Sequence, residues 1–272
     1  MNPMARRMFE LVEPIGVLPY AADEPNETMF ALGFTNYWDI YFAGRAAPLG
    51  RPTAEVVDAL FYNFAPGEVA RHIPKVWHTT TPEAATAARQ AGCVAALRRI
   101  LGDRVPTPEL ARATELLTRA ATSAPPQGRP MYAALLALPV PEETLARLFF
   151  AASLLREHRG DGHIAALVVE GIGGLEAHVL LALDLPLPAV QFGRLHHLPA
   201  AQIEAVVDGL RQRGLVGGDG WFTEQGRAVK RRVEELTDDL AARPYEVLDA
   251  EERDELVRLL EPIAALLLAA QD

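Results

Sequence analysis

The feature that most restricts the fold of this chain is a helix-start signal that recurs along it. Thr81–Pro82–Glu83 and Thr107–Pro108–Glu109 each place a hydroxyl before a proline and an acidic residue, which is the order typical of a helix N-terminus. Pro141–Glu142–Glu143 repeats the proline and acidic part, and Asp249 with Glu252 forms a capping box. The predicted helices end at Leu101, about Thr122, about His158 and Ala269. Few other segments alternate like strands.

The composition supports a buried core. Half of the 272 residues are apolar, which is enough for one large domain or two modest ones. Cys93 is the only cysteine, so a disulfide framework and a cysteine-based zinc cluster are excluded and a reducing compartment is expected. Residues 1–10 lack the layout of a signal peptide, and the apolar stretch 262–270 is shorter than the ~20 residues of a membrane span. We therefore expect a cytoplasmic protein that does not cross a membrane.

Residues 162–242 follow the order of elements in a winged helix. Predicted helices are followed by two short apolar runs, Leu215–Val216 and Trp221–Phe222, on either side of a glycine-rich turn. This pattern predicts one small β-hairpin, and a long helix then leads away from it. The predicted helices cover 162–170, 175–183, 200–213 and about 223–242.

Two phrases in this module resemble the MarR family of winged helix-turn-helix regulators. They are IEAVVDGLRQRGLV at Ile203–Val216 and FTEQGRAVKRR at Phe222–Arg232. Over nearly the whole chain, the sequence resembles a little-characterised actinobacterial branch of that superfamily, through Tyr37–Gly50, Phe61–Pro66 and the REHRGDGH motif at Arg156–His163. The resemblance implies a homodimer built from terminal helices, a recognition helix at 200–213 in a major groove and a wing in a minor groove.

The expected architecture is therefore mainly α, with a helical N-terminal part and a MarR-like winged-helix module that carries one small β-hairpin. We expect a helical domain at 1–155 that supplies the wall of a ligand pocket. A winged-helix-like domain is expected at 156–248. The C-terminal helix at 249–272 is expected to serve dimerisation.

Charge disfavours DNA as a partner. The net charge is −10, whereas phosphate contacts by lysine and arginine supply most of non-specific DNA affinity. In the candidate recognition helix, Glu204 and Asp208 lie beside Arg211 and Arg213, and the wing tip carries an aspartate in place of a groove-binding arginine. The candidate DNA contacts are Arg211 and Arg213, together with Arg227 from the basic run that follows the wing.

The densest group of functional side chains is the REHRGDGH motif. One interpretation is structural, with Gly160 ending one helix and Asp161 capping the next. The other is a catalytic corner formed by Glu157, His158, Asp161 and His163. His158 at a helix C-terminus would favour imidazolium and His163 at an N-terminus would favour the neutral ring. Opposed environments of this kind separate an acid from a base.

A metal-binding alternative uses His158 and His163 with a carboxylate from Glu157 or Asp161. Two imidazoles and one carboxylate suit zinc or non-haem iron, but here the ligands would have to converge across a turn. The sequence identifies no cofactor. It also lacks a Walker loop, a GxGxxG turn and a serine elbow, which disfavours nucleotide-binding, dehydrogenase and hydrolase functions.

A second group of polar-tipped side chains lies on one predicted helical stripe. Phe34, Tyr37, Tyr41 and Arg45 are spaced at i, i+3, i+7 and i+11. Such stripes are usually core, but this one ends in two phenols and a guanidinium, so it predicts the wall of a pocket. The candidate ligand-binding residues are Tyr37, Tyr41, Arg45, Asn63 and Arg159.

The sequence thus predicts a small-molecule-binding winged-helix protein, a MarR-like regulator that responds to a ligand. The alternative is an enzyme on a winged-helix scaffold, whose Glu157–His163 corner performs acid–base or metal chemistry on a substrate held by Arg45. A third possibility is an assembly protein that uses 251–270 as a partner helix. The expected partners are a small-molecule ligand and a second copy of the chain.

Overall fold

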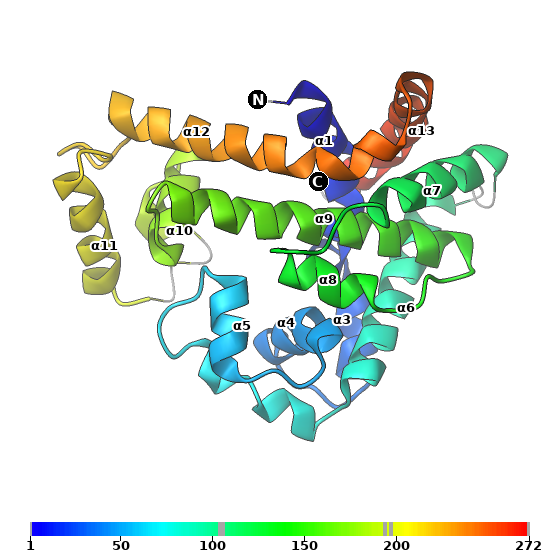
Figure 1. Cartoon of the computed structure of the whole chain (residues 1–272). Helices are drawn as coiled ribbons and strands as arrows, with labels where there is room; N and C mark the ends of the chain where they lie inside the picture. Colours follow the sequence, from blue (N-terminus) through cyan, green and yellow to red (C-terminus); the bar gives the residue numbers. More distant parts are fainter. Residues whose placement is uncertain (1, 103–106, 193–194, 196–197, 271–272) are drawn as a thin grey trace.

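The computed structural model describes residues 2–102, 107–192, 195 and 198–270, and in these residues the chain is mainly helical. Strand pairing within the same residues is limited to one isolated antiparallel bridge. Three hydrophobic clusters organise the helices. Figure 1 shows α9 running through the middle of the molecule with α12 lying along it, and these two helices are in extensive contact.

The first cluster surrounds the first half of α9 (Thr144–Val169). Leu148 and Leu154 are completely buried there, and each buried leucine contributes about 1.5–3 kcal/mol relative to an exposed one. Cys93 is a free thiol within the same cluster. The helices that cover this part of α9 are α1 (Pro3–Gly16), α6 (Pro82–Leu101), α7 (Pro108–Ala121) and α13 (Ala250–Ala269).

The second cluster is aromatic and centres on α4 (Tyr37–Ala46). The rings of Phe42 and Phe61 are stacked with centroids 6.0 Å apart. α8 (Pro130–Leu136) joins the two clusters, because Met131 packs in the second and Tyr132 in the first. The remaining elements of this region are α2 (Leu18–Ala21), α3 (Asp23–Phe30), α5 (Ala54–Phe61), η1 (Ala47–Leu49), η2 (Val69–Arg71) and η3 (Lys75–His78).

The third cluster holds α10 (Gly174–Asp184), α11 (Ala200–Gln212) and the first half of α12 (Glu224–Ala241). The bridge joins Val216 to Phe222, and the Gly217 N–H donates to the Trp221 carbonyl at 2.8 Å. A single bridge thus stands where a hairpin of two strands was expected. η5 (Ala189–Gln191) lies between α10 and α11, and η6 (Arg243–Val247) leads from α12 to α13.

The helix-start signals act as the sequence predicts. The Thr81 and Thr107 hydroxyls accept hydrogen bonds from the Ala84 and Leu110 N–H groups. Asp249 and Glu252 cap each other's backbone N–H in both directions. Because each cap satisfies an N–H left unpaired in the first turn, α6, α7 and α13 begin within one residue of their predicted starts.

The predicted helix break at Gly160 was wrong, because α9 is one helix of 26 residues. Gly162 leaves room inside it for the Arg129 guanidinium, which would have to shift if a Cβ were added at this position. That guanidinium donates to the His158 carbonyl at 2.6 Å and to the Leu240 carbonyl at 3.0 Å. Burial of α9 outweighs the ~1 kcal/mol that a glycine costs in a helix interior. The expected domain boundary between residues 155 and 156 therefore falls within α9.

In the described residues, no single helix is long and apolar enough to cross a membrane. α9 and α10 reach the necessary length and composition only as a pair, bent by 103°.

The turn between α9 and α10 is docked onto the second cluster through Tyr62. This residue has φ +62°, a backbone conformation that is costly for a large side chain. Its hydroxyl donates to the Ile172 carbonyl at 2.6 Å. Its own carbonyl lies so close to Gly174 that there is no room for a Cβ at that position. The third cluster is thereby fixed to the rest of the chain at α9–α10 as well as along α12.

We expect Gly174→Ala to lower the free energy of unfolding by about 1–3 kcal/mol, because the added methyl group would overlap the Tyr62 carbonyl. Chemical denaturation measures the change. Gly218→Ala is the matched control, since a Cβ at Gly218 would have no neighbouring atom within 4 Å. Equal stability of the two variants would contradict this docking contact.

Candidate functional site

The predicted stripe on α4 meets the predicted corner on α9 through one ion pair. Arg45 Nη1 donates to the Tyr41 hydroxyl at 3.0 Å, and Arg45 Nη2 donates to Glu157 Oε2 at 3.2 Å. Burial would raise the pKa of Glu157, but the charges of Arg45 and Arg156 outweigh it and hold the pKa below its usual value. Glu157 is therefore ionised and neutralises Arg45. A carboxyl group that stays ionised is unsuited to act as a general acid.

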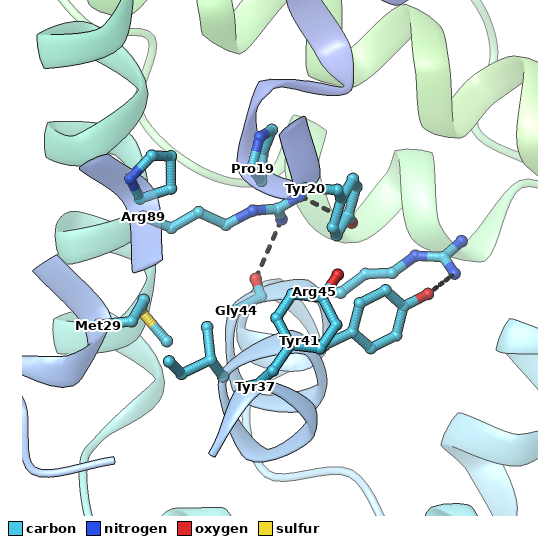
Figure 2. A pocket seen from close by; sticks show the side chains of 10 residues that line it. Pro19, Tyr20, Met29, Tyr37, Tyr41, Gly44, Arg45 and Arg89 are labelled. Atoms are coloured by element: carbon cyan, nitrogen blue, oxygen red, sulfur yellow. Dashed lines mark hydrogen bonds between the residues drawn. The ribbon is translucent and has the colours of Figure 1, made fainter. Parts of the chain in front are cut away.

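The space beside this stripe is small. Figure 2 shows Tyr37, Tyr41 and Arg45 on one side of it, with Tyr20 and Arg89 opposite. The cavity measures about 10 Å³, which is room for about one water molecule. The expectation that Tyr37, Tyr41 and Arg45 share one wall is therefore met, but the wall encloses no space for an organic ligand.

The other two candidate ligand residues lie elsewhere. Asn63 lies against Gly174 at the α9–α10 turn, and its buried Oδ1 has no hydrogen-bond partner among the described residues. Arg159 lies on another side of α9, where its guanidinium lies 4.2 Å from the centre of the Phe9 ring. The five predicted residues do not form one pocket.

Arg159 belongs to a buried charge cluster that ties α12 to α9 and α1. It donates to Asp238 Oδ1 at 2.8 Å, and Arg6 donates to Asp238 Oδ2 at 2.9 Å. The Asp238 side chain is fully buried. Glu234 also accepts from Arg6 and Lys230. Burial would raise the pKa of Glu234, but the nearby cations, Lys230 first, lower it to about 2. The acidic and the basic side chains of the cluster are therefore both charged at neutral pH.

The two histidines of the motif lie in separate environments. The His158 ring packs edge-on against Tyr132, with centroids 5.0 Å apart, whereas His163 Nδ1 lies 3.0 Å from the Thr237 hydroxyl. Burial lowers the pKa of both imidazoles to about 4. The predicted opposition of an acid and a base was wrong, because neither residue lies at an end of α9 and both rings are shifted in the same direction.

Asp161 caps a different helix from the one predicted. Its carboxylate accepts from the Met131 and Tyr132 N–H groups, in the first turn of α8. Burial raises its pKa to about 6. Within the described residues, no group of three or more His, Cys, Asp and Glu side chains is arranged to hold a metal ion. The corner therefore acts as a junction of four helices.

A much larger cavity lies next to the small one, and no sequence pattern predicted it. Its volume is about 540 Å³, within the ~300–1,000 Å³ range of small-molecule sites. Gly44 and Arg89 line both cavities. The remaining lining comes from η1 and Gly50, from the first half of α6, from α8 with the segment after it, and from α9. These residues are Ala47, Pro48, Pro82, Glu83, Thr86, Ala87, Gln90, Leu135, Leu138, Pro139, Val140, Pro141, Phe149, Phe150 and Ser153.

The candidate DNA-contacting arginines differ in availability. Arg211 binds Asp208 at 2.7 Å and the Gly217 carbonyl at 3.3 Å, and Arg213 binds Glu176 at 2.9 Å. Arg227 is exposed on α12. Arg231, one turn further along, is exposed on the same side of the helix. Neither Arg227 nor Arg231 forms an ion pair within the described part of the chain.

Comparison with known proteins identifies a family for this chain. The model of a helix-turn-helix family matches residues 5–272. The chain belongs to this helix-turn-helix family. The match runs from α1 to α13. In this helix-turn-helix protein it therefore includes both the large cavity and the third cluster. No curated protein matches the chain, and no solved structure does.

We expect Asp238→Asn to destabilise the protein by about 3 kcal/mol, because it removes the buried countercharge of Arg6 and Arg159 and leaves them only the partly exposed Glu234. Asp254→Asn, the same change at an exposed position on α13, should alter stability by less than about 0.5 kcal/mol. Urea unfolding of both variants tests this. If Asp238→Asn were as stable as Asp254→Asn, the cluster would contribute nothing to holding α12.

Both motif imidazoles should stay neutral down to about pH 5, since their folded-state pKa values lie near 4. The unfolded chain takes up these protons near pH 6.5. Their contribution to stability is therefore complete above pH 6.5 and is lost as the pH falls towards 4. Asp161 acts in the opposite sense over pH 3.8 to 6, because its folded-state pKa is raised. NMR titration of His158 and His163 separates these effects, and midpoints near 6.5 would refute the burial argument.

Proposed function

We propose that this helix-turn-helix protein is a ligand-responsive DNA-binding regulator, with a MarR-like winged helix made of α10, α11, the turn at 217–221 and α12. The observation that carries the proposal is the path of α9. Phe149, Phe150 and Ser153 on α9 line the large cavity, and the same helix continues without a break to the turn that begins α10. A rigid helix transmits a displacement at one end to the other.

The charge cluster supplies the second connection. Arg159 on α9 and Arg6 on α1 hold Asp238 on α12, so α12 follows α9 and α1 when either moves. A ligand that changes the packing around Phe149 and Phe150 would thus shift α10 and α12 together. Packed helices have discrete arrangements rather than continuous ones, so a small shift at the cavity becomes a defined shift of α11.

The proposed DNA surface combines α11 with the exposed arginines of α12. Arg227 and Arg231 carry unneutralised charge for phosphate contacts, whereas Arg211 and Arg213 are engaged in ion pairs of their own. Glu204 on the exposed side of α11 opposes close approach of phosphate. We therefore infer modest affinity that rests mainly on α12, and base contacts that depend on the exact placement of α11.

A homodimer completes the proposal. Two recognition helices in a dimer read half-sites about one helical turn apart, so a ligand that alters their spacing alters affinity. The inner face of α13 is already used against α1 and α7 within one chain. A dimer contact of α13 would therefore use its outer face, where Leu268 is 51% exposed.

The test is salt-dependent binding to duplex DNA from the region upstream of the protein's own gene, followed by fluorescence anisotropy. We expect the double variant Arg227→Ala/Arg231→Ala to reduce the slope of log K against log salt by about 2, one for each lost phosphate contact. Arg51→Ala/Arg71→Ala removes the same charge from exposed positions distant in sequence from α12 and serves as the control. Absence of salt-sensitive binding to any such fragment would refute the proposal.

A further inference from the structure

We propose that the 540 Å³ cavity binds a small apolar molecule that carries one anionic group, with the anion beside Arg89. This inference deepens the proposed function, and its consequence for DNA binding rests on that function. Occupancy of the cavity can be measured without DNA.

The walls of the cavity specify the apolar part of the ligand. Phe149 and Phe150 are buried at its base, and the segment after α8 adds Leu138 and Val140. Val140 is 46% exposed, although the transfer of an apolar side chain out of water is favourable. A ligand of matching size would cover it. The lining therefore favours aromatic or aliphatic carbon over sugars or nucleotides.

Arg89 specifies the charge. Its Nη1 donates to the Gly44 carbonyl at 3.0 Å and its Nη2 to the Tyr20 hydroxyl at 2.9 Å, as Figure 2 shows. Both acceptors are neutral, and a guanidinium has five N–H groups. No carboxylate in the described residues forms an ion pair with Arg89. A half-buried cation that is hydrogen-bonded only to neutral groups attracts an anion more strongly than one in water.

Three neighbouring arginines, unlike Arg89, have carboxylate partners. Arg45 is neutralised by Glu157, Arg156 by Glu13 and Arg159 by Asp238. Each of those pairs closes a contact between helices. Arg89 is held in place by neutral groups and faces the cavity wall, with Gly44 leaving space for its side chain. The charge left over is available to a ligand.

The other charged group of the lining fixes the orientation. Glu83 lies six residues before Arg89 on α6, about 9 Å along the helix axis. An anion is repelled at the Glu83 end and attracted at the Arg89 end. The polar side chains of Gln90 and Ser153 also line the cavity and offer hydrogen bonds. We therefore infer an elongated ligand whose apolar part extends towards Glu83.

Two fluorescent probes with the same ring systems test the assignment. 8-Anilinonaphthalene-1-sulfonate is an apolar anion, and N-phenyl-1-naphthylamine is its neutral counterpart. We expect the sulfonate to bind with one site per chain. Arg89→Gln should weaken its binding by about tenfold or more, the cost of losing a charge-assisted hydrogen bond. The same variant should change the affinity of the neutral probe by less than about twofold.

A cavity-filling variant locates the site independently. Ala87 is exposed on the cavity side of α6, so Ala87→Trp should fill the cavity without disturbing the core and should abolish binding of both probes. Ala95→Trp places the same side chain at an exposed position of α6 outside the cavity and should leave both affinities unchanged. Circular dichroism checks that each variant is folded.

The outcomes separate this inference from the proposed function. Unchanged sulfonate binding in Ala87→Trp would overturn the site, and equal losses for both probes in Arg89→Gln would overturn the anionic group. If Arg89→Gln does not fold, Arg89→Lys takes its place. We expect the affinity of Arg89→Lys for the sulfonate to lie within about tenfold of that of the unmodified chain, because the positive charge is kept. Sulfonate binding as expected with no effect on DNA affinity would leave the site in place and refute the regulatory role. DNA binding with no probe in the cavity would refute only the ligand.

Discussion

The arrangement of the whole molecule depends on one buried carboxylate, that of Asp238. Moving a charge out of water costs several kcal/mol, and here the cost is offset only because Arg6 and Arg159 approach it from two different helices. If either partner were displaced, the buried carboxylate would keep only one countercharge. The ion pairs therefore give α1, α9 and α12 one relative position. Hydrophobic packing alone would allow neighbouring positions, since it has little directional preference.

The same logic explains why the REHRGDGH motif looks like a catalytic site in the sequence. Its charged and polar groups contact several different helices: Glu157 contacts α4, Arg159 α12 and Asp161 α8. Each contact satisfies a polar group that burial would otherwise leave unpaired. The side chains radiate from α9 because residues one or two apart on a helix point to different faces. A cluster that is dense in the sequence is thereby dispersed in space.

The region with room for chemistry or binding is built differently. The cavity beside α6 has few polar groups, and its single strong feature is an arginine whose partners are neutral. Small residues such as Ala87 and Gly44 leave space, while the buried rings of Phe149 and Phe150 supply apolar surface. The helix that carries those rings also carries Arg159 and ends at α10. One element therefore connects the large cavity, the charge cluster and α10.

The sequence by itself determined the positions of most helices and the helix-turn-helix family of the chain. Caps such as Thr81 and the Asp249–Glu252 box act over three or four residues, so local chemistry is sufficient to predict them. It also indicated that Arg45 and Tyr41 share a face. Tertiary structure alone decided that α9 continues through Gly160, because the helices that bury it and the Arg129 side chain that packs against Gly162 are remote in sequence. Tertiary structure likewise decided where the open space lies. A cavity forms where packed segments leave space between them. The lining of this one comes from η1, α6, α8 and α9, so no pattern within a single segment could predict it.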